Sequence, residues 1–409
     1  MRILIATQTY YPKTNGQAVF AVNLAEGLAD KGHQVLVVMP SGRIRAHVTK
    51  KNGVEISAIT AVPLIPFDAN VHVTPRPGPQ IRSILDEFQP EIVHVQDHYP
   101  LCRSVARAAG KRGFPLVGTN HFLPRNMIPF FPFLPKFPRG RQFLEKLLWK
   151  TVVITYNHLD AVTAPTETAA QILRHHGIRV PVHAITCGVD LNHFHPDPTV
   201  DRTKLLAKYG LDPERTIFLY VGRLDQDKGL DLLIESFHLL KRQDLQLGVA
   251  GHGHFFKSLQ ELVGEFNLGE KVIFTGYVPA SDLPSLYNSV DFFAMPSEAE
   301  LQSIATLEAM GTGRPVLAAN ARALPELVKD GVNGCLFKAG DPEDAARCIS
   351  ELVEECYSWA AMSAASLEIV RPHHIGHMLH DYLRLYDSVI QAAYSDAGPL
   401  HLFQGDTQA

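Results

Sequence analysis

Short apolar runs alternate with amphipathic segments along most of this chain, and that alternation constrains its fold more than any other feature. The runs are rich in valine, isoleucine and leucine, which is typical of strands buried on both faces of a parallel sheet with helices on each side. They form two series, 2–8, 34–40, 91–97, 114–120, 160–165 and 182–188, then 216–222, 245–251, 271–276, 291–297, 314–320 and 334–337. The sequence therefore predicts an α/β protein that uses this architecture twice.

The length of 409 residues also favours two domains. The segment NHFHPDPTVDR (192–202) is rich in proline and polar residues and lacks an apolar period, so we interpret it as the linker. We predict a Rossmann-like N-terminal domain over 1–195 and a Rossmann-like C-terminal domain over 196–372. The helical pattern IGHMLHDYLRLYDSVIQAAY, within 373–396, follows the second sheet and is expected to cross back to the N-terminal domain.

Composition excludes several classes of protein. The net charge of −4 provides no basic field for nucleic acid, which we do not expect as a partner. No stretch of about eighteen apolar residues occurs, and the first apolar run is too short for a signal peptide, so we expect a cytoplasmic protein that does not span the membrane. The five cysteines are scattered without a C-x-x-C pair, which argues against a disulfide framework and a zinc site and favours a reducing compartment: Cys102, Cys187, Cys335, Cys348 and Cys356.

Two loops of the second series carry candidate phosphate-binding residues. After the strand TIFLYVG, the turn GRLDQDKGLD places the cations Arg223 and Lys228 five residues apart, with Gly222 and Gly229 relieving the backbone. Such a turn suits a diphosphate, although a solvated turn with surface charges has the same composition.

The second loop, PSEAELQSIATLEAMGTGRPV (296–316), places Glu300 just before a helix that is expected to begin near Gln302 or Ser303. Glu308 would then lie between one and two turns inside that helix. The backbone N–H groups of Leu301, Gln302 and Ser303 and the helix dipole would form an anion site, flanked by two carboxylates about 12 Å apart. A nucleotide sugar has this arrangement of hydroxyls and diphosphate. The alternative is an acidic residue that complements the helix dipole, plus an ordinary exposed glutamate.

Weaker candidates lie elsewhere. In FTGYVP, Gly276 allows close approach of the chain to a flat ring, and the backbone near Tyr277 and Val278 would read the edge of a base. In HVQDH, His94 is expected to pack in the sheet, whereas His98 lies where an acceptor would enter.

The segment 126–150, NMIPFFPFLPKFPRGRQFLEKLLWK, interleaves five phenylalanines and Trp149 with Arg139, Arg141, Lys146 and Lys150. This composition suits the interface of an anionic membrane leaflet and predicts a peripheral contact and a lipid acceptor. The alternative is a loop that packs its aromatic rings inside the protein.

Together, VGRLDQDKGLDLLIESF, FTGYVP, PSEAELQSIATLEAMGTGRPV and LPELVKDGVNGCLF resemble the retaining glycosyltransferases of family four, which have the GT-B fold of two Rossmann-like domains facing across a cleft. The resemblance covers nearly the whole chain. It implies that the equivalents of Arg223 and Lys228 bind the donor diphosphate, and that Glu300 contacts the transferred sugar and Glu308 the ribose. His121, in GTNHFLPRN, matches a histidine placed beside the reacting carbon.

Two departures from the family pattern are present. Leu301, Gln302 and Ser303 replace the usual Gly-Phe-Gly, and the paired glycines of the first domain appear as Asn15 and Gly16, so Gly16 alone carries over. The order of Glu300 and Gln302 resembles that of diacylglycerol glucosyltransferases.

The resemblance implies transfer of a hexose from a UDP-sugar to an acceptor hydroxyl with retention of configuration. We expect the hexose to be glucose. Neither a metal nor another cofactor is expected, since no Asp-x-Asp motif or His-Cys cluster with metal spacing occurs. Alternatives are a soluble acceptor, a non-hydrolysing UDP-sugar epimerase of the same architecture, and a sugar-nucleotide sensor without turnover.

Overall fold

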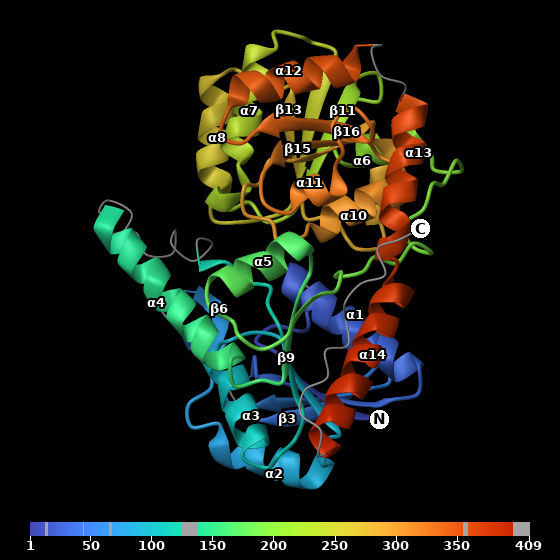
Figure 1. Ribbon diagram of the computed structural model, residues 1–409. Coiled ribbons are helices and arrows are strands. Elements are labelled where there is room, and N and C mark those ends of the chain that lie inside the picture. Colours follow the sequence, from blue (N-terminus) through green and yellow to red (C-terminus); the bar gives the residue numbers. More distant parts are fainter. Residues whose placement is uncertain (13–14, 44, 65–67, 125–137, 355–358, 396–409) are drawn as a thin grey trace. The chain divides into compact units, whose positions relative to one another are not determined.

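The computed structural model describes residues 1–12, 15–43, 45–64, 68–124, 138–354 and 359–395 (Figure 1). The chain forms two compact units. Unit 1 contains Met1–Thr186 and the residues from Met378 onward, and unit 2 contains Cys187–His377. The segment interpreted as the linker, 192–202, therefore belongs to unit 2.

Unit 1 follows the predicted alternation of strands and helices. Its elements are β1 (Arg2–Ala6), α1 (Gly16–Asp30), β2 (Gln34–Pro40), β3 (His47–Lys51), β4 (Val54–Ile59), β5 (Val62–Leu64), β6 (Asp68–Val73), α2 (Gly78–Phe88), β7 (Ile92–Val95), α3 (Pro100–Gly110), β8 (Leu116–Thr119), α4 (Pro138–Tyr156), β9 (Ala161–Ala164), α5 (Glu167–His175) and β10 (Val182–Ala184).

The main sheet of unit 1 has the strand order β10-β9-β8-β7-β1-β2-β4-β3. Its neighbouring strands run parallel except β3, which pairs antiparallel with β4. Because crossovers are right-handed and the order reverses at β1, α1 and α3 cover opposite faces. Strands β5 and β6 form a separate antiparallel pair. The carboxyl ends of β1, β7 and β8 share one edge of the sheet, which is where ligands bind in such folds.

Unit 2 repeats this architecture. Its elements are α6 (Arg202–Lys208), β11 (Thr216–Val221), the 3-10 helix η2 (Gln226–Lys228), α7 (Leu230–Leu239), β12 (Leu245–Ala250), α8 (Phe256–Glu265), β13 (Val272–Gly276), α9 (Leu283–Ser289), β14 (Phe292–Met295), α10 (Ile304–Gly311), β15 (Val316–Asn320), α11 (Leu324–Leu327), β16 (Gly334–Lys338), α12 (Pro342–Val353), α13 (Trp359–Val370) and η3 (Arg371–His373).

The sheet of unit 2 is parallel throughout, in the order β13-β12-β11-β14-β15-β16. Strand β14 is fully buried, and the rings of Phe218 and Phe292 stack in the core with their centroids 4.7 Å apart. The predicted fold class, two Rossmann-like parallel-sheet domains, is confirmed.

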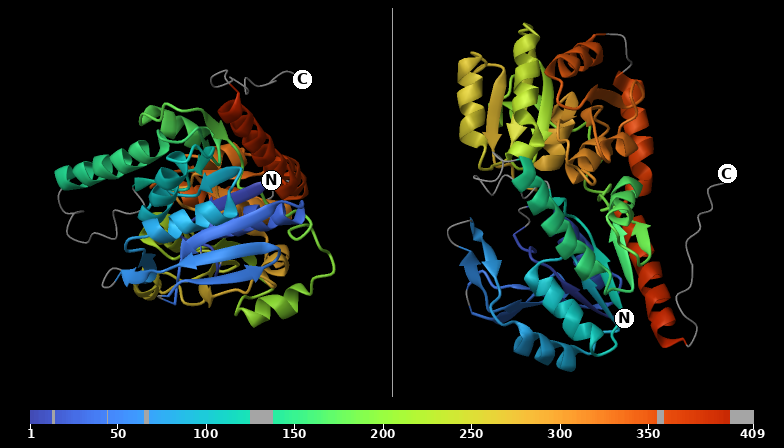
Figure 2. Two further views of the ribbon diagram at one scale, coloured as in Figure 1. Left: turned by 90° about the horizontal axis from the view of Figure 1, so that it is seen from below. Right: turned by 60° about the vertical axis from the view of Figure 1, so that its left-hand side comes forward.

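The last helix, α14 (Ile375–Tyr394), has the bounds that the sequence pattern predicts. From Met378 on it belongs to unit 1, where it lies beside α1 (Figures 1 and 2). Leu379 lies so close to Gly27 of α1 that a Cβ built there would be 2.6 Å from its Cδ1 atom. The absence of a side chain at Gly27 therefore permits this helix contact.

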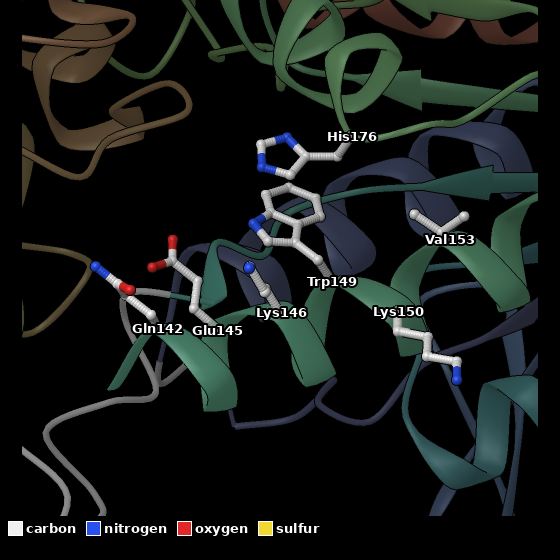
Figure 3. A pocket seen from close by; sticks show the side chains of 7 residues that line it. All are labelled: Gln142, Glu145, Lys146, Trp149, Lys150, Val153 and His176. Carbon is white, nitrogen blue, oxygen red and sulfur yellow. The ribbon is translucent and has the colours of Figure 1, made fainter. Parts of the chain in front are cut away.

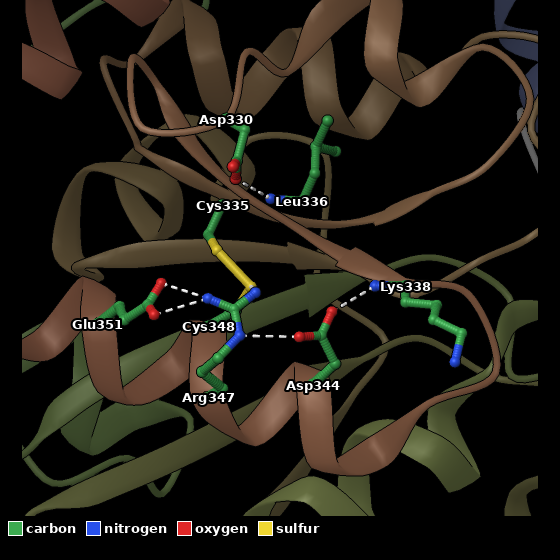
Figure 4. The surroundings of a disulfide bond; sticks show 8 residues. All are labelled: Asp330, Cys335, Leu336, Lys338, Asp344, Arg347, Cys348 and Glu351. Atoms are coloured by element: carbon green, nitrogen blue, oxygen red, sulfur yellow. Dashed lines mark hydrogen bonds and ion pairs between the residues drawn. A yellow bond between two sulfur atoms is a disulfide. The ribbon is translucent and has the colours of Figure 1, made fainter.

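The structure corrects the expectation that the cysteines stay unpaired. Cys335 of β16 and Cys348 of α12 form a disulfide, with their Cα atoms 5.7 Å apart (Figure 4). A spacing of 13 residues matches no motif. The thiols meet because α12 packs back on the strand that precedes it. Cys102 and Cys187 are free and buried, and Cys356 lies outside the described residues.

Candidate active site

The helix after β14 begins where the sequence predicts. With Ser303 as the N-cap, the first N–H groups of the helix belong to residues 304–306, one turn later than the predicted Leu301, Gln302 and Ser303. Ser303 caps α10, since its side chain accepts a hydrogen bond from the N–H of Thr306 at 3.2 Å. Glu300 therefore lies just before the helix and Glu308 in its second turn. The position of the helix start is confirmed.

Glu300 and Lys228 form an ion pair at this helix end. The Lys228 Nζ lies 2.7 Å from Oε1 of Glu300 and 3.6 Å from Asp227, and the Lys228 and Glu300 side chains are only 15% and 13% exposed. Burial by itself lowers the pKa of Lys228, but the carboxylates of Glu300 and Asp227 outweigh it, so the pKa is raised. Lys228 is thus a fixed positive charge beside the positive end of α10.

The turn after β11 brings this lysine to the loop after β14. Gly229 has φ of 67°, and a Cβ there would lie 2.7 Å from the carbonyl oxygen of Pro296, so only glycine permits this approach. The Tyr220 hydroxyl donates to the carbonyl of Arg223 at 2.7 Å, which fixes the start of the turn after Gly222. The Arg223 side chain is exposed and pairs with Asp225.

The second carboxylate is held from another helix. The buried hydroxyl of Tyr287, on α9, donates to Oε2 of Glu308 at 3.1 Å. Burial and this carboxylate raise the pKa of Tyr287 well above its usual value, so the hydroxyl keeps its proton. Glu308 is therefore oriented by a neutral donor.

The side chains that replace Gly-Phe-Gly are buried. Leu301 is 7% and Gln302 8% exposed. Gln302 Oε1 accepts from the backbone N–H of Cys187 at 2.7 Å, and its Nε2 lies 3.5 Å from Nδ1 of His373. The Gln302 amide thus links the loop to the first and last segments of unit 2, a use of this side chain that the sequence did not reveal.

The candidate base-binding turn follows β13. Gly276 has φ of 72°, a left-handed conformation that favours glycine. Tyr277 is 68% exposed and Val278 is buried, so the tyrosine ring is available to a ligand.

In unit 1, Gly16 is the first residue of α1 and Asn15 is its N-cap. The Asn15 side chain accepts from the N–H of Ala18 at 2.9 Å. Asn15, which stands where the family has a second glycine, thus caps α1, and the helix still begins at Gly16.

His121 lies just beyond β8. Its Nε2 is 3.4 Å from Oε1 of Gln96, and its ring packs against Phe20 of α1 with centroids 4.6 Å apart. Burial lowers the pKa of His121 to about 3, so the imidazole is neutral at physiological pH.

His94 is buried in the sheet, as predicted, with its two ring nitrogens 2.6 Å from the hydroxyls of Tyr386 and Thr119. His98 is also buried, against Phe122, and burial lowers its pKa to about 4.

Asp97 accepts hydrogen bonds from the backbone N–H of Gln8 and from the side chain of Gln17, each at 2.9 Å. The sequence analysis did not identify these contacts of Asp97, since they join positions more than 75 residues apart.

A cavity of about 530 Å³ lies on α4, and none of these candidate residues borders it. It is bordered by Gln142, Glu145, Lys146, Trp149, Lys150, Val153 and His176 (Figure 3). The rings of Trp149 and His176 stack 3.8 Å apart, and Trp149 is only 7% exposed. This tryptophan therefore packs inside, whereas 126–137 of the aromatic-basic segment lie outside the described residues.

Within the described ranges, one group has metal-ligating atoms close together: Cys335, Cys348 and Glu351. The two sulfurs are joined to each other, and Glu351 pairs with Arg347 at 2.6 Å (Figure 4). None of the described helices is both long and apolar enough to cross a membrane.

Two Rossmann-like parallel-sheet units are the architecture of the GT-B glycosyltransferases. The family models support this class: "Glycosyltransferase Family 4" matches residues 14–193 and "Glycosyl transferases group 1" matches residues 201–365. The chain belongs to glycosyltransferase family four and has the GT-B fold.

Among curated relatives, a GDP-mannose-dependent alpha-mannosyltransferase of Corynebacterium glutamicum is 27% identical, over 98% of this chain and 92% of its own length. An alpha-monoglucosyldiacylglycerol synthase of Streptococcus pneumoniae is 26% identical, over 82% and 75%. A sucrose-phosphate synthase from Thermosynechococcus elongatus has a similar structure, with a TM-score of 0.78 and 20% identity over 96% of this chain and 100% of that one. The Anabaena protein Alr3699/HepE in complex with UDP has a TM-score of 0.75 at 20% identity, over 95% and 100%.

Proposed function

We propose that this glycosyltransferase moves a hexose from a UDP-sugar to the hydroxyl of a membrane lipid, with retention of configuration and without a metal. The observation that carries the proposal is the Lys228–Glu300 pair, which sets a cation and a carboxylate 2.7 Å apart beside the N-terminus of α10. Lys228, Arg223 and the helix end would stabilise charge developing on the departing diphosphate. Glu300 would accept hydrogen bonds from the transferred sugar.

The remaining candidate residues would contact other parts of the donor. Glu308 would hold the ribose hydroxyls, and Tyr277 and Val278 the base. In unit 1, the Gly16 N–H would act on the leaving diphosphate and His121 would lie beside the reacting carbon, as the family resemblance implies.

UDP-glucose is the first candidate donor, because the relative named alpha-monoglucosyldiacylglycerol synthase makes a glucosylated lipid, the kind of product that we propose here. A second candidate is GDP-mannose. It is favoured by the mannosyltransferase relative, whose similarity extends over 98% of this chain.

A lipid acceptor is supported by one face of α4. Phe143, Leu147 and Ile154 are 69%, 47% and 46% exposed, and at about 100° per residue they point within about 40° of one another. Lys146 and Lys150 are exposed beside them. An exposed apolar stripe with adjacent cations is suited to peripheral contact with an anionic leaflet.

The test uses purified protein, UDP-glucose or GDP-mannose, and vesicles with or without diacylglycerol or phosphatidylinositol. We expect nucleotide release and a glycolipid product with one donor, only when the lipid acceptor is present, and an unchanged rate after chelation of divalent metals. NMR of the product should show the anomeric configuration of the donor. Interconversion of the donor sugar without an acceptor would instead identify an epimerase, and binding without turnover a sensor.

A further inference from the structure

Gln96 lies between two imidazole rings at the carboxyl end of β7. It is fully buried, and its backbone N–H donates to the carbonyl of Ala6 at 2.9 Å. Its side-chain Nε2 is 3.4 Å from both ring nitrogens of His94, and its Oε1 is 3.4 Å from Nε2 of His121. The amide therefore connects a structural histidine to a candidate catalytic one.

The surroundings of His94 determine which way this amide points. Both ring nitrogens of His94 already contact hydroxyls at 2.6 Å, those of Tyr386 and Thr119. Gln96 Nε2 is equally distant from the two nitrogens, each of which already has a hydroxyl partner, so it is directed at neither one alone. An N–H group is attracted to the electron-rich imidazole, whereas a carbonyl oxygen is not. The amide N–H thus faces His94, and the carbonyl oxygen faces His121.

This orientation settles the proton on His121. A carbonyl oxygen can only accept, so Nε2 of the neutral His121 ring must carry the hydrogen. The Phe20 ring, tilted by 55° against the imidazole, restricts its rotation. The titratable neighbours on the packed elements, His94 on β7 and Tyr386 on α14, are uncharged, since burial lowers the pKa of His94 and raises that of Tyr386.

We propose that Gln96 is a positioning residue that holds His121 in the Nε2–H tautomer, which leaves Nδ1 as a hydrogen-bond acceptor for a hydroxyl of the bound substrate. The inference rests on the proposed function, in which His121 contacts the substrate. It adds that His121 acts as a neutral acceptor and not as a proton donor.

The test compares Gln96→Ala and Gln96→Glu in the full chain labelled with [15N]histidine. Long-range 1H–15N correlation spectra report the tautomer of each imidazole, and His121→Gln identifies the His121 signals. We expect the wild type to show one neutral Nε2–H form and Gln96→Ala to show a tautomer mixture, with kcat on the order of tenfold lower because the ring is no longer oriented.

Gln96→Glu keeps an acceptor oxygen and should restore the single tautomer at high pH. Its carboxylate favours the imidazolium, so kcat should decrease as the pH falls from 8 to 6, a range in which the wild type is flat. Thr163→Val is the matched control. Thr163 contacts Thr119 at 2.6 Å and Tyr382 at 2.9 Å in the same buried network, so this variant perturbs the network while the Gln96 and His121 side chains are kept.

A single Nδ1–H form in the wild type, or a Gln96→Ala variant with unchanged His121 signals, would overturn the proposal. So would a tautomer mixture in Gln96→Ala with unchanged kcat. The spectra do not depend on turnover. An inactive wild type with the expected tautomer would therefore refute the proposed function and leave the Gln96–His121 contact supported.

Discussion

The pair formed by Lys228 and Glu300 combines a structural role with the proposed catalytic one. Lys228→Met leaves the largely buried carboxylates of Glu300 and Asp227 without their cation, which we expect to destabilise the protein by roughly 3–5 kcal/mol. Glu300→Gln should destabilise it less, because Asp227 remains as a partner of Lys228. The double variant removes the Lys228–Glu300 pair but leaves Asp227 without a cation, so it should recover only part of the loss. Urea unfolding measures the stability, and nucleotide release measures transfer.

All three variants should lose transfer if, as proposed, Lys228 binds the diphosphate and Glu300 the sugar. The double variant is therefore the informative control, since it separates lost activity from lost stability. Appreciable transfer by a well-folded double variant would show that the pair is structural only.

Two buried histidines, His94 and His98, and the half-buried His121 predict a loss of stability in mild acid. Burial lowers the pKa of His94 and of His121 to about 3 and that of His98 to about 4. In the unfolded chain these histidines bind protons below about pH 6.5, whereas in the folded chain they stay neutral until a lower pH. Their contribution to stability is therefore fully present above about pH 6.5 and is lost as the pH falls toward their pKa values in the folded chain. Each histidine should contribute roughly 2 kcal/mol of destabilisation at pH 5.

Urea unfolding of the wild type between pH 7.5 and pH 5 measures this dependence, and His98→Asn should reduce it by about one third. Buried Asp97 opposes the trend, since burial raises its pKa and favours the folded state in acid. A midpoint that does not change with pH would contradict the lowered pKa values of these three rings.

At the residue scale, sequence patterns located Glu300, Lys228 and the cap near Ser303, because helix starts and charged turns are local features. They did not locate the partners of Gln302 or Asp97. The Gln302 side chain contacts Cys187, 115 positions away, and Asp97 contacts Gln17, 80 positions away. Such contacts depend on how the strands are ordered in the sheet, which no local pattern specifies.

Helix α4 supplies a prediction at the scale of one element. Phe143→Ser with Leu147→Ser should abolish co-sedimentation with anionic vesicles, because it removes the most exposed apolar groups of the stripe. Lys146→Glu with Lys150→Glu should weaken binding at low salt and remove its salt dependence.

Val48→Ser is the matched control, since Val48 of β3 is 64% exposed in the same unit but outside this stripe. It should bind vesicles as the wild type does. Both α4 variants should still release nucleotide with a detergent-dispersed acceptor if the stripe acts only in docking. Wild-type binding by the serine variant would exclude this face as the membrane contact.

The elements differ in how well the sequence predicts them. Strands such as β1 and β11 are continuous apolar runs, and α14 has a strong helical period, so their positions follow from the pattern. Strand β3 is mostly exposed and polar, whereas its partner β4 is mostly buried. An edge strand of this kind has no apolar signal, and it forms because β4 offers a hydrogen-bonding edge.

At the scale of the whole molecule, the chain builds unit 1 from two separate segments. The carboxyl-terminal segment packs on unit 1 mainly through apolar side chains, and two of its tyrosine hydroxyls also contact polar side chains of the sheet. Tyr386 meets His94 at 2.6 Å, and the hydroxyl of Tyr382 lies 2.9 Å from Thr163 and 3.1 Å from Thr119. Unit 1 is therefore incomplete until residues beyond Met378 have been made, which predicts that a fragment ending at Thr186 does not fold by itself.

Two tyrosine hydroxyls on α14 test how much this return of the chain contributes to stability. Tyr386→Phe removes the partner of a fully buried histidine nitrogen and should lower the free energy of unfolding by about 1–3 kcal/mol. Tyr394→Phe, on the same helix but 70% exposed, should change it by less than about 0.5 kcal/mol. Urea unfolding followed by circular dichroism compares the two. If Tyr386→Phe were as stable as Tyr394→Phe, α14 would be held on unit 1 by apolar packing alone, and the hydroxyl contact with His94 would not contribute to the fold.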